Sequence, residues 1–444
     1  MRRSNCALAA VLAALVVSAG GVRAGEEDRI FSDGFDPCVG LACFQVPCSA
    51  GATTSVSGVV YAPNGTLPLP NVLVYVPNAP LEALPDGVQC ARCDTPPSGA
   101  PLVSTLSAAD GRFTLENVPA TADVPLVLLS GKWRRQIVVP NVAACVDTPV
   151  APAATRLPRN RSEGDLPRIA VSTGAADAME CLLRKSGIDD AEFTVAGAAG
   201  RVHLFAGAGG ADRFDAAHGG AAFPASPAAL WDSPASLAGY DSVLLSCEGS
   251  QGAQTKPPNA LAAMKGYADA GGRLYAEHWH NYWLQAGPSP WPALATWNFQ
   301  ADLGELDTTV EQGFAQGDIL AQWLFAVGAS ATPGELVVQE AQHTVTGIDA
   351  AVAKRWIYRE QTANGTPSVQ YFSFTTPVEA GPAQQCGRVV FTDVHGTPAD
   401  SSSSGSPGFP SGGCHSPADQ LTPQEKALLY AIFDLGRCVG STRE

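Results

Sequence analysis

The fold of the larger part of this chain is indicated by residues 241–280, which read DSVLLSCEGS QGAQTKPPNA LAAMKGYADA GGRLYAEHWH. The run Asp241–Leu245 is apolar enough to be a strand that is buried on both faces of a sheet. It is followed by a predicted helix from about Asn259 to Ala270, which two glycines end, and by the strand Leu274–Ala276. A strand, a helix and a second strand in this order predict a right-handed crossover within a parallel sheet.

The same alternation of strands and helices continues on both sides of this stretch. Apolar runs at Ile169–Val171 and Val202–Phe205 predict two earlier strands, and Arg388–Thr392 predicts a late one. A capping box, Thr422-Pro423-Gln424-Glu425, predicts the start of the last helix. Residues 166–440 are therefore predicted to form one α/β domain on an open parallel sheet.

Residues 53–150 have a different pattern, which is typical of a small antiparallel β-sandwich. Short alternating runs between turn residues predict strands at Val56–Tyr61, Val72–Val76, Arg112–Leu115 and Val124–Leu129. Residues 151–165 are rich in proline, alanine and arginine and predict a linker. The chain is thus expected to contain two globular domains.

The N-terminus has the three parts of a secretory signal. Arg2 and Arg3 precede the apolar stretch Ala7–Ala19, and Val22-Arg23-Ala24 is typical of a cleavage site. Residues 1–24 are therefore predicted to be a signal peptide, and residues 25–52 a cysteine-containing leader. The apolar run is too short to span a bilayer. We expect a secreted or periplasmic protein without a membrane span.

The charge of the chain limits its partners. Its 444 residues carry a formal net charge of −15 at pH 7. Such a chain repels the phosphate backbone of nucleic acids and anionic lipid surfaces. We therefore expect no nucleic-acid partner. The ligand class that remains in our prediction is a small molecule or a carbohydrate, for reasons given below.

The cysteines indicate disulfide bonds. Loss of Cys6 with the signal leaves eleven of the twelve cysteines, and export makes disulfides the default. An odd number leaves at least one thiol unpaired or bonded between chains. Cys90 and Cys93 have the spacing of half a zinc site, but no second half follows at metal spacing, so structural disulfides are expected. Cys181 is a candidate partner for Cys247.

Polar residues follow several of the predicted strands of the α/β domain. Ligands of open parallel sheets bind outside the carboxyl ends of the strands. The residues with useful chemistry at these positions are Ser172, Cys247, Glu248, Glu277, His278, His280, Asp393 and His395.

The first domain resembles the carboxypeptidase regulatory-like (transthyretin-like) β-sandwich. The resemblance lies in Ser57-Gly58-Val59-Val60, Pro70–Val74, Asp110–Leu115 and Val118-Pro119. An insertion from about residue 78 to residue 100 departs from the family pattern. The resemblance implies an accessory domain without catalysis.

Residues 166–438 resemble ThuA-like proteins of the class I glutamine amidotransferase-like superfold. The carrying stretches are Tyr240–Leu245, Ala270–Leu274 running into His278, His343–Ile348, and Gly387–Thr392 with His395. The resemblance implies a flavodoxin-like sheet with a nucleophilic cysteine on the elbow after the Gly-Gly strand. Here Glu277-His278 stands at the elbow, and His395 occupies the position of the late histidine. An intact cysteine-dependent amidotransferase site is therefore not expected, and a sugar-related or other small-molecule function is implied.

Three functions remain open for this edge, and whether the protein is an enzyme stays undecided. In the first, a divalent transition metal binds to His278, His280, Asp393 and His395, and Glu277 acts as the base for a metal-bound water. In the second, Cys247 is a nucleophile that His278 or His395 activates.

In the third, the edge binds a small molecule, with a carbohydrate as one candidate, and catalyses nothing. Tryptophan faces stack well on sugar rings, although tryptophans also pack in cores. The candidate ligand-binding residues are Ser172, Glu248, Trp279 and Tyr282.

Overall fold

The computed structural model describes residues 38–396, 408–410, 414 and 421–440. The predicted signal peptide, residues 1–24, and the first part of the leader lie outside the described residues. Within the described part of the chain, no helix combines the length and the apolar character that crossing a membrane requires.

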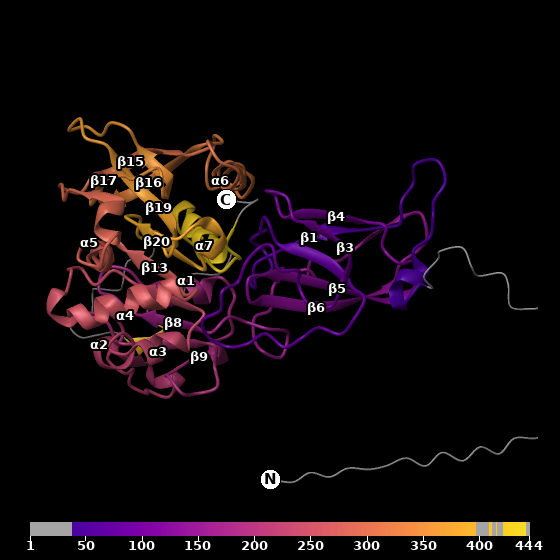
Figure 1. Ribbon diagram of the computed structural model, residues 1–444, viewed down its shortest axis with the longest axis horizontal. Helices are drawn as coiled ribbons and strands as arrows, with labels where there is room; N and C mark the ends of the chain where they lie inside the picture. The colour runs from indigo at the N-terminus through magenta and orange to yellow at the C-terminus, as the bar shows by residue number, and fades with distance from the viewer. Residues whose placement is uncertain (1–37, 397–407, 411–413, 415–420, 441–444) are drawn as a thin grey trace, which may run out of the picture. The chain divides into compact units, whose positions relative to one another are not determined.

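Residues 53–150 form two small sheets with apolar inner faces. Their strands are β1 (Ser55–Val59), β2 (Leu73–Pro77), β3 (Pro101–Leu106), β4 (Arg112–Glu116), β5 (Ala122–Ser130), β6 (Trp133–Asn141) and β7 (Asp147–Pro149). One sheet has the order β4-β1-β7 and the other the order β3-β2-β5-β6. Figure 1 labels strands β1, β3, β4, β5 and β6 of this part of the chain. All pairs are antiparallel except β1 with β7. In β4, Phe113 and Leu115 are buried between exposed residues, as the alternating sequence predicts.

A ten-stranded sheet organises the rest of the chain. Its strands are β8 (Ile169–Ser172), β9 (Phe193–Thr194), β10 (Val202–Phe205), β12 (Ser242–Leu245), β13 (Arg273–Glu277), β15 (Gly304–Val310), β16 (Glu335–Ala341), β18 (Ala353–Arg359), β19 (Ser368–Thr376) and β20 (Gly387–Thr392). The strand order is β16-β15-β18-β19-β20-β13-β12-β8-β10-β9. Every residue of β8, β10, β12, β13 and β20 is buried, which explains their continuous apolar runs.

The expectation of a wholly parallel sheet needs a correction. Strands β9 to β20 in this order pair in parallel, but β20, β19, β18, β15 and β16 pair antiparallel. The added strands β15 and β16 alternate between buried and exposed residues, because only one of their faces is covered. The sheet is therefore mixed, with its parallel half at the end nearest β9.

Helices cover both faces of the parallel half. The helices are α1 (Met179–Lys185), α2 (Ser226–Ala229), α3 (Pro234–Ala238), α4 (Pro258–Asp269), α5 (Tyr282–Gln285), α6 (Ala315–Ala326) and α7 (Pro423–Leu435). Buried residues of α4 share a cluster with Val243 and Leu245 of β12, whereas those of α1 and α7 share another cluster with Leu244. Alternate residues of one strand thus face opposite layers. The capping box at Thr422 and Glu425 is present as predicted.

Short elements complete the described part. The 3-10 helices are η1 (Gly40–Phe44), η2 (Asp190–Glu192), η3 (Ala216–His218), η4 (Ala253–Thr255), η5 (His278–Asn281), η6 (Trp291–Leu294) and η7 (Pro382–Gln384). Two further strand pairs are formed by β11 (Arg213–Phe214) with β21 (Gly408–Phe409), and by β14 (Ala295–Trp297) with β17 (Val345–Ile348).

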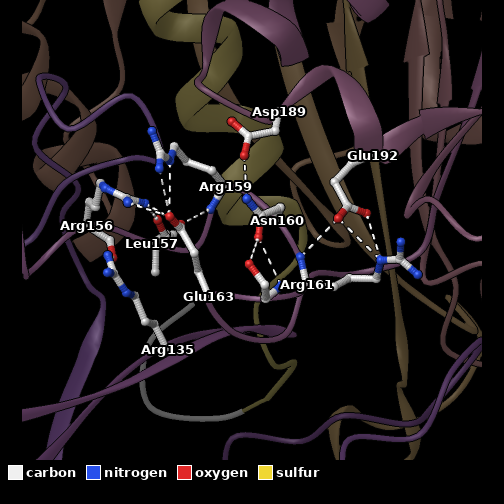
Figure 2. A network of polar contacts seen from close by, with 10 residues as sticks. Arg135, Arg156, Leu157, Arg159, Asn160, Arg161, Glu163, Asp189 and Glu192 are labelled. Atoms are coloured by element: carbon white, nitrogen blue, oxygen red, sulfur yellow. Dashed lines mark hydrogen bonds and ion pairs between the residues drawn. The ribbon is translucent and has the colours of Figure 1, made fainter.

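The segment predicted as a linker is tied down by polar contacts (Figure 2). The guanidinium groups of Arg156 and Arg159 both bond to the carboxylate of Glu163, at 2.6–2.9 Å. Arg161 pairs with Glu192, and Asp165 pairs with Arg134 of β6. Residues 151–165 are therefore an ordered strap rather than a flexible connection.

Disulfides connect segments that are far apart in the sequence. The described pairs are Cys48–Cys145, Cys90–Cys386, Cys93–Cys438 and Cys181–Cys414, and Cys38 and Cys43 are disulfide-bonded as well. Cys90 and Cys93 are thus structural, as predicted, and each bonds to a residue of the predicted α/β domain. The suggested bond between Cys181 and Cys247 is wrong, because Cys181 bonds to Cys414. Cys247 is the free cysteine of the described residues, in agreement with the odd count.

Candidate functional site

The strand order of the parallel half reverses at β8, because β10 lies on one side of it and β12 on the other. This position is the topological switch point of the sheet. In open α/β sheets, ligands commonly bind at such a point, outside the carboxyl ends of the strands. Cys247 follows β12 directly and therefore lies at this edge of the sheet.

His278 stands at a sharp turn between β13 and η5. Its backbone φ is +38°, a value that residues with a side chain rarely adopt. Such strain costs on the order of 1–3 kcal/mol and is found most often at functional positions. A strand-to-helix turn of this kind presents one side chain at the top of a sheet.

Three side chains from neighbouring strands meet at this edge. Cys247 follows β12, His278 follows β13 and His395 follows β20, and these strands are adjacent in the sheet. Their potential ligand atoms all lie within 4.8 Å of one another. The Sγ of Cys247 is 3.5 Å from Nδ1 of His278, and the two imidazole rings are 5.2 Å apart between centroids.

Burial favours the uncharged forms of the three groups. Burial lowers the pKa of His278 to about 3 and also lowers the pKa of His395. Burial, and next the charge of Glu277, raise the pKa of the Cys247 thiol. The Nε2 atom of His395 is buried and has no hydrogen-bond partner among the described residues. Neutral imidazoles with free lone pairs are the form that binds metals.

Glu277 lies fully buried beneath the three residues. Its Oε2 accepts a hydrogen bond of 3.0 Å from the backbone N–H of Cys247. Burial, and next the neighbouring charge of Asp177, raise its pKa well above the usual value. A carboxyl group that keeps its proton cannot accept one from a metal-bound water. The raised pKa therefore does not favour the predicted role of Glu277 as a general base.

Two further buried acids lie near Glu277, and the sequence analysis missed them. Asp177 accepts hydrogen bonds from the backbone N–H groups of Ala178 (2.7 Å) and Gly396 (2.6 Å). Burial raises the pKa of Glu180 to about 8, with a smaller effect from Asp177. Asp177 follows β8 at the same carboxyl edge, which is the signal that could have identified it.

The structure does not bring His280 and Asp393 to the three-residue cluster. The Nε2 of His280 lies 2.8 Å from the carbonyl oxygen of Ser246, and its Nδ1 accepts a 3.1 Å bond from the indole N–H of Trp283. Asp393 accepts a 2.8 Å bond from the N–H of Thr344, and burial raises its pKa to about 7. Both ring nitrogens of His280 are engaged, and Asp393 bonds to Thr344. The geometry therefore favours Cys247 as the third ligand in place of these two residues.

The predicted ligand-binding residues differ in accessibility. Ser172 is fully buried and bonds to the Oγ of Ser226 at 2.7 Å, and Glu248 forms a buried ion pair of 2.7 Å with Lys256. Tyr282 packs, partly buried, against the core on the α4 side of the sheet.

Trp279 remains the best candidate of this group. Its ring lies 4.8 Å from the ring of His278, and it stacks on the exposed Phe299 with 5.5 Å between centroids and 13° between planes. The pair forms a partly accessible aromatic surface beside the cluster.

Comparisons with known proteins leave the family of this chain open. No protein-family model and no curated protein matches it. Chains from two crystal structures of a type II cohesin–X-dockerin complex of Acetivibrio cellulolyticus, an N-terminal and a C-terminal interface mutant, show a partial likeness. The identities are 15% and 14%, over 28% of this chain and 79% and 76% of those chains, and both TM-scores are 0.16. A TM-score this low carries no argument, so the two family resemblances stay predictions.

Proposed function

We propose that this is an exported protein whose α/β domain binds a transition metal through Cys247, His278 and His395. The observation that carries the proposal is the convergence of three ligand atoms, from three adjacent strands, within 4.8 Å. Thiolate and imidazole are the donors that zinc and similar soft or borderline ions prefer. The number of disulfides is typical of proteins from oxidising compartments and supports export.

The spacing of the donors suits a tetrahedral ion. Zinc–sulfur and zinc–nitrogen bonds of about 2.3 and 2.0–2.1 Å set a sulfur–nitrogen separation of roughly 3.6 Å. The separation between Cys247 Sγ and His278 Nδ1 is 3.5 Å. A bound cation would also remove the thiol proton that burial retains. The high pKa of the free thiol speaks against the alternative in which Cys247 is a nucleophile by itself.

Three protein ligands leave a fourth position open, which is the arrangement of catalytic rather than structural zinc sites. A water at that position would have a lowered pKa and could attack a substrate. We therefore propose metal-assisted hydrolysis of a small molecule. Trp279 and Phe299 offer a ring-stacking surface beside His278, which fits a sugar or a sugar derivative as the substrate.

The strand order supports the predicted amidotransferase-like architecture. The neighbouring parallel strands are β10, β8, β12, β13 and β20, with the short β9 at the edge. When these five strands are numbered by their order along the chain, the spatial order is 2-1-3-4-5, as in flavodoxin-like sheets. In this proposal His278 stands on the elbow where the related enzymes carry their cysteine, so the metal replaces the covalent mechanism.

Carbohydrate binding without chemistry is the second candidate. The observation in its favour is the burial of Glu277 beside Asp177, which raises the pKa of Glu277 and disfavours its use as a carboxylate base for a metal-bound water. Under this proposal the Trp279–Phe299 surface binds the sugar, and the cluster orients the loop after β13.

The test is the metal content of the mature protein, purified without chelator and reconstituted with zinc. We expect about one ion per chain in the wild type and less than a tenth of that in His278→Ala. His280→Gln is the control variant matched to His278→Ala, because glutamine keeps one donor for Ser246 and one acceptor for Trp283. This variant should retain its metal.

Cobalt provides a spectroscopic measurement at the same site. A cobalt(II)–thiolate charge-transfer band should appear in the wild type and disappear in Cys247→Ser. Absence of metal from the reconstituted wild type, or equal metal in His278→Ala, would overturn the proposal. Loaded protein that hydrolyses no ester, amide or glycoside probe but binds sugars through Trp279 would favour the second candidate.

A further inference from the structure

A cavity lies away from the three residues of the proposed metal site. Its volume is about 1000 Å³, and its walls come from β2, β3, the turn between β5 and β6, segment 82–98 and the helices α6 and α7. None of Cys247, His278 and His395 contributes to the lining. It is therefore a separate space, and any role of it is independent of the proposed metal site.

The wall formed by the four-stranded sheet carries an apolar patch. In the register of this sheet, Leu73 faces Leu106 of β3 on one side and Leu129 of β5 on the other, so the three side chains share one face. The opposite face, with Val74 and Val76, is already buried in the core. Antiparallel sheets commonly leave one face to water. Here the second face is apolar as well, and Ile319 of α6 adds to the same lining.

The polar part of the lining is basic. Six basic and four acidic residues line the cavity, in a chain whose net charge is −15. Ion pairs join acidic and basic residues of this lining, among them Lys132 with Asp241 and Arg437 with Asp434, so the excess is two basic residues. Three lining residues also keep a buried polar atom without a partner among the described residues, namely Ser130 Oγ, Gln316 Oε1 and Arg437 Nε. The residue Ser130 is only 3% exposed. Unsatisfied buried atoms are rare, and water or a bound molecule usually supplies the missing partner.

The walls are fixed before any ligand enters. The disulfides Cys90–Cys386 and Cys93–Cys438 anchor segment 82–98 to the residues on the other side. Gly131, with φ +58°, approaches α7 so closely that a Cβ atom would lie 2.0 Å from the carbonyl oxygen of Gly436. A preformed cavity between two layers of a protein loses little free energy on ordering when it binds a ligand.

We propose that this cavity binds a small amphipathic acid. The apolar body of the ligand lies against the face of Leu73, Leu106 and Leu129, and its anionic head group is attracted by the excess of two basic residues in the lining. A ligand of this class explains both the second apolar face of the sheet and the excess of basic residues. The site is distinct from the sheet edge, so a protein without bound metal should still bind the acid.

The test is fluorescence titration of the full mature protein with 8-anilinonaphthalene-1-sulfonate, an apolar anion, followed by displacement with decanoate. Ser104 lines the cavity from an exposed strand position, so Ser104→Trp fills the space without replacing a core residue. Thr114→Trp is the matched control, because Thr114 is an exposed strand residue that does not line the cavity.

We expect one saturable site, displacement by decanoate, at least tenfold weaker binding in Ser104→Trp and unchanged binding in Thr114→Trp. The cation decylammonium should displace the probe at least tenfold less well than decanoate. Absence of saturable binding, equal binding in the two tryptophan variants, or equal displacement by decylammonium would each overturn the proposal. Because His278→Ala leaves this cavity intact, binding in that variant separates this proposal from the metal site.

Discussion

Polar groups around Glu163 and polar groups at the edge of the parallel sheet are arranged in opposite ways. The guanidinium group of Arg156 bonds to both carboxylate oxygens of Glu163, and that of Arg159 bonds to one of them (Figure 2). These contacts, that of Arg156 most of all, hold the pKa of Glu163 far below its usual value. At the sheet edge, Glu277 Oε1 and His395 Nε2 are buried without partners among the described residues. Burial there favours the neutral forms of both groups.

This difference separates polar groups that stabilise the fold from polar groups that reduce its stability. A paired carboxylate gains charge-assisted hydrogen bonds, whereas an unpaired buried acid gives up hydration without replacement. Natural proteins keep unfavourable groups of the second kind mainly at sites. The contrast is the reason for placing the function at the sheet edge and for assigning the strap a structural role.

The largest expected effect comes from Glu163→Ala. The side chain of Glu163 is 15% exposed, and its removal leaves Arg156 and Arg159 facing each other without the shared carboxylate. We expect the free energy of unfolding at pH 7 to fall by about 2–3 kcal/mol. Urea denaturation measures it, with Glu116→Ala, at an exposed position on β4, as the control. A loss no larger than that of the control would contradict the structural role of the strap.

An intermediate effect of opposite sign is expected for Glu180→Gln. Burial raises the pKa of Glu180 to about 8, so the folded protein keeps a proton that the unfolded chain releases above about pH 4.3. The wild type therefore loses stability as the pH rises from about 4.3 to 8, and the glutamine variant does not. We expect the free energy of unfolding of the variant, measured by urea denaturation, to exceed that of the wild type by about 2 kcal/mol at pH 7.

Glu163→Gln reverses this pH dependence and sharpens the comparison. The low pKa of Glu163 contributes stability above the unfolded value, and this contribution is lost as the pH falls toward the folded value. The deficit of Glu163→Gln should thus be equal at pH 7 and pH 5 and shrink below about pH 4.3, whereas the gain of Glu180→Gln already shrinks between pH 7 and pH 5. Denaturation series at about pH 7, 5 and 3 measure both. A deficit that shrinks between pH 7 and pH 5, or a gain that does not, would refute the assignment.

The sequence predicted the strands of the parallel half and the residues at their carboxyl ends. Continuous apolar runs located β8, β12, β13 and β20. The rule for carboxyl edges then selected eight residues, of which the structure brings Cys247, His278 and His395 together. These inferences hold because a buried parallel strand has a local signature and fixes where the next residue lies. The capping box of α7 was predictable for the same reason, since its contacts span only three residues.

Residues whose role depends on distant neighbours were not predictable. An extended strand would place His278 and His280 on the same side, but the positive φ of His278 and the 3-10 turn η5 carry His280 inward to Ser246. Asp177 gains its importance only from Glu277, one hundred residues later in the chain. The antiparallel strands β15, β16 and β18 lack continuous apolar runs, and β19 alone among the added strands is buried along nearly its whole length. The addition of these strands to the parallel sheet therefore had no comparable signal.

The smallest expected change in stability is that of Cys247→Ala. The thiol is fully buried, its Sγ lies 3.5 Å from Nδ1 of His278, and alanine removes only a single sulfur atom from the interior. We expect the metal-free protein to lose no more than about 1 kcal/mol of unfolding free energy. Addition of zinc should raise the melting temperature of the wild type and leave that of the variant unchanged, since ligands stabilise only the state that binds them. A variant that still gains stability from zinc would show that Cys247 is not a ligand and that the unpaired groups of the sheet edge serve some other site.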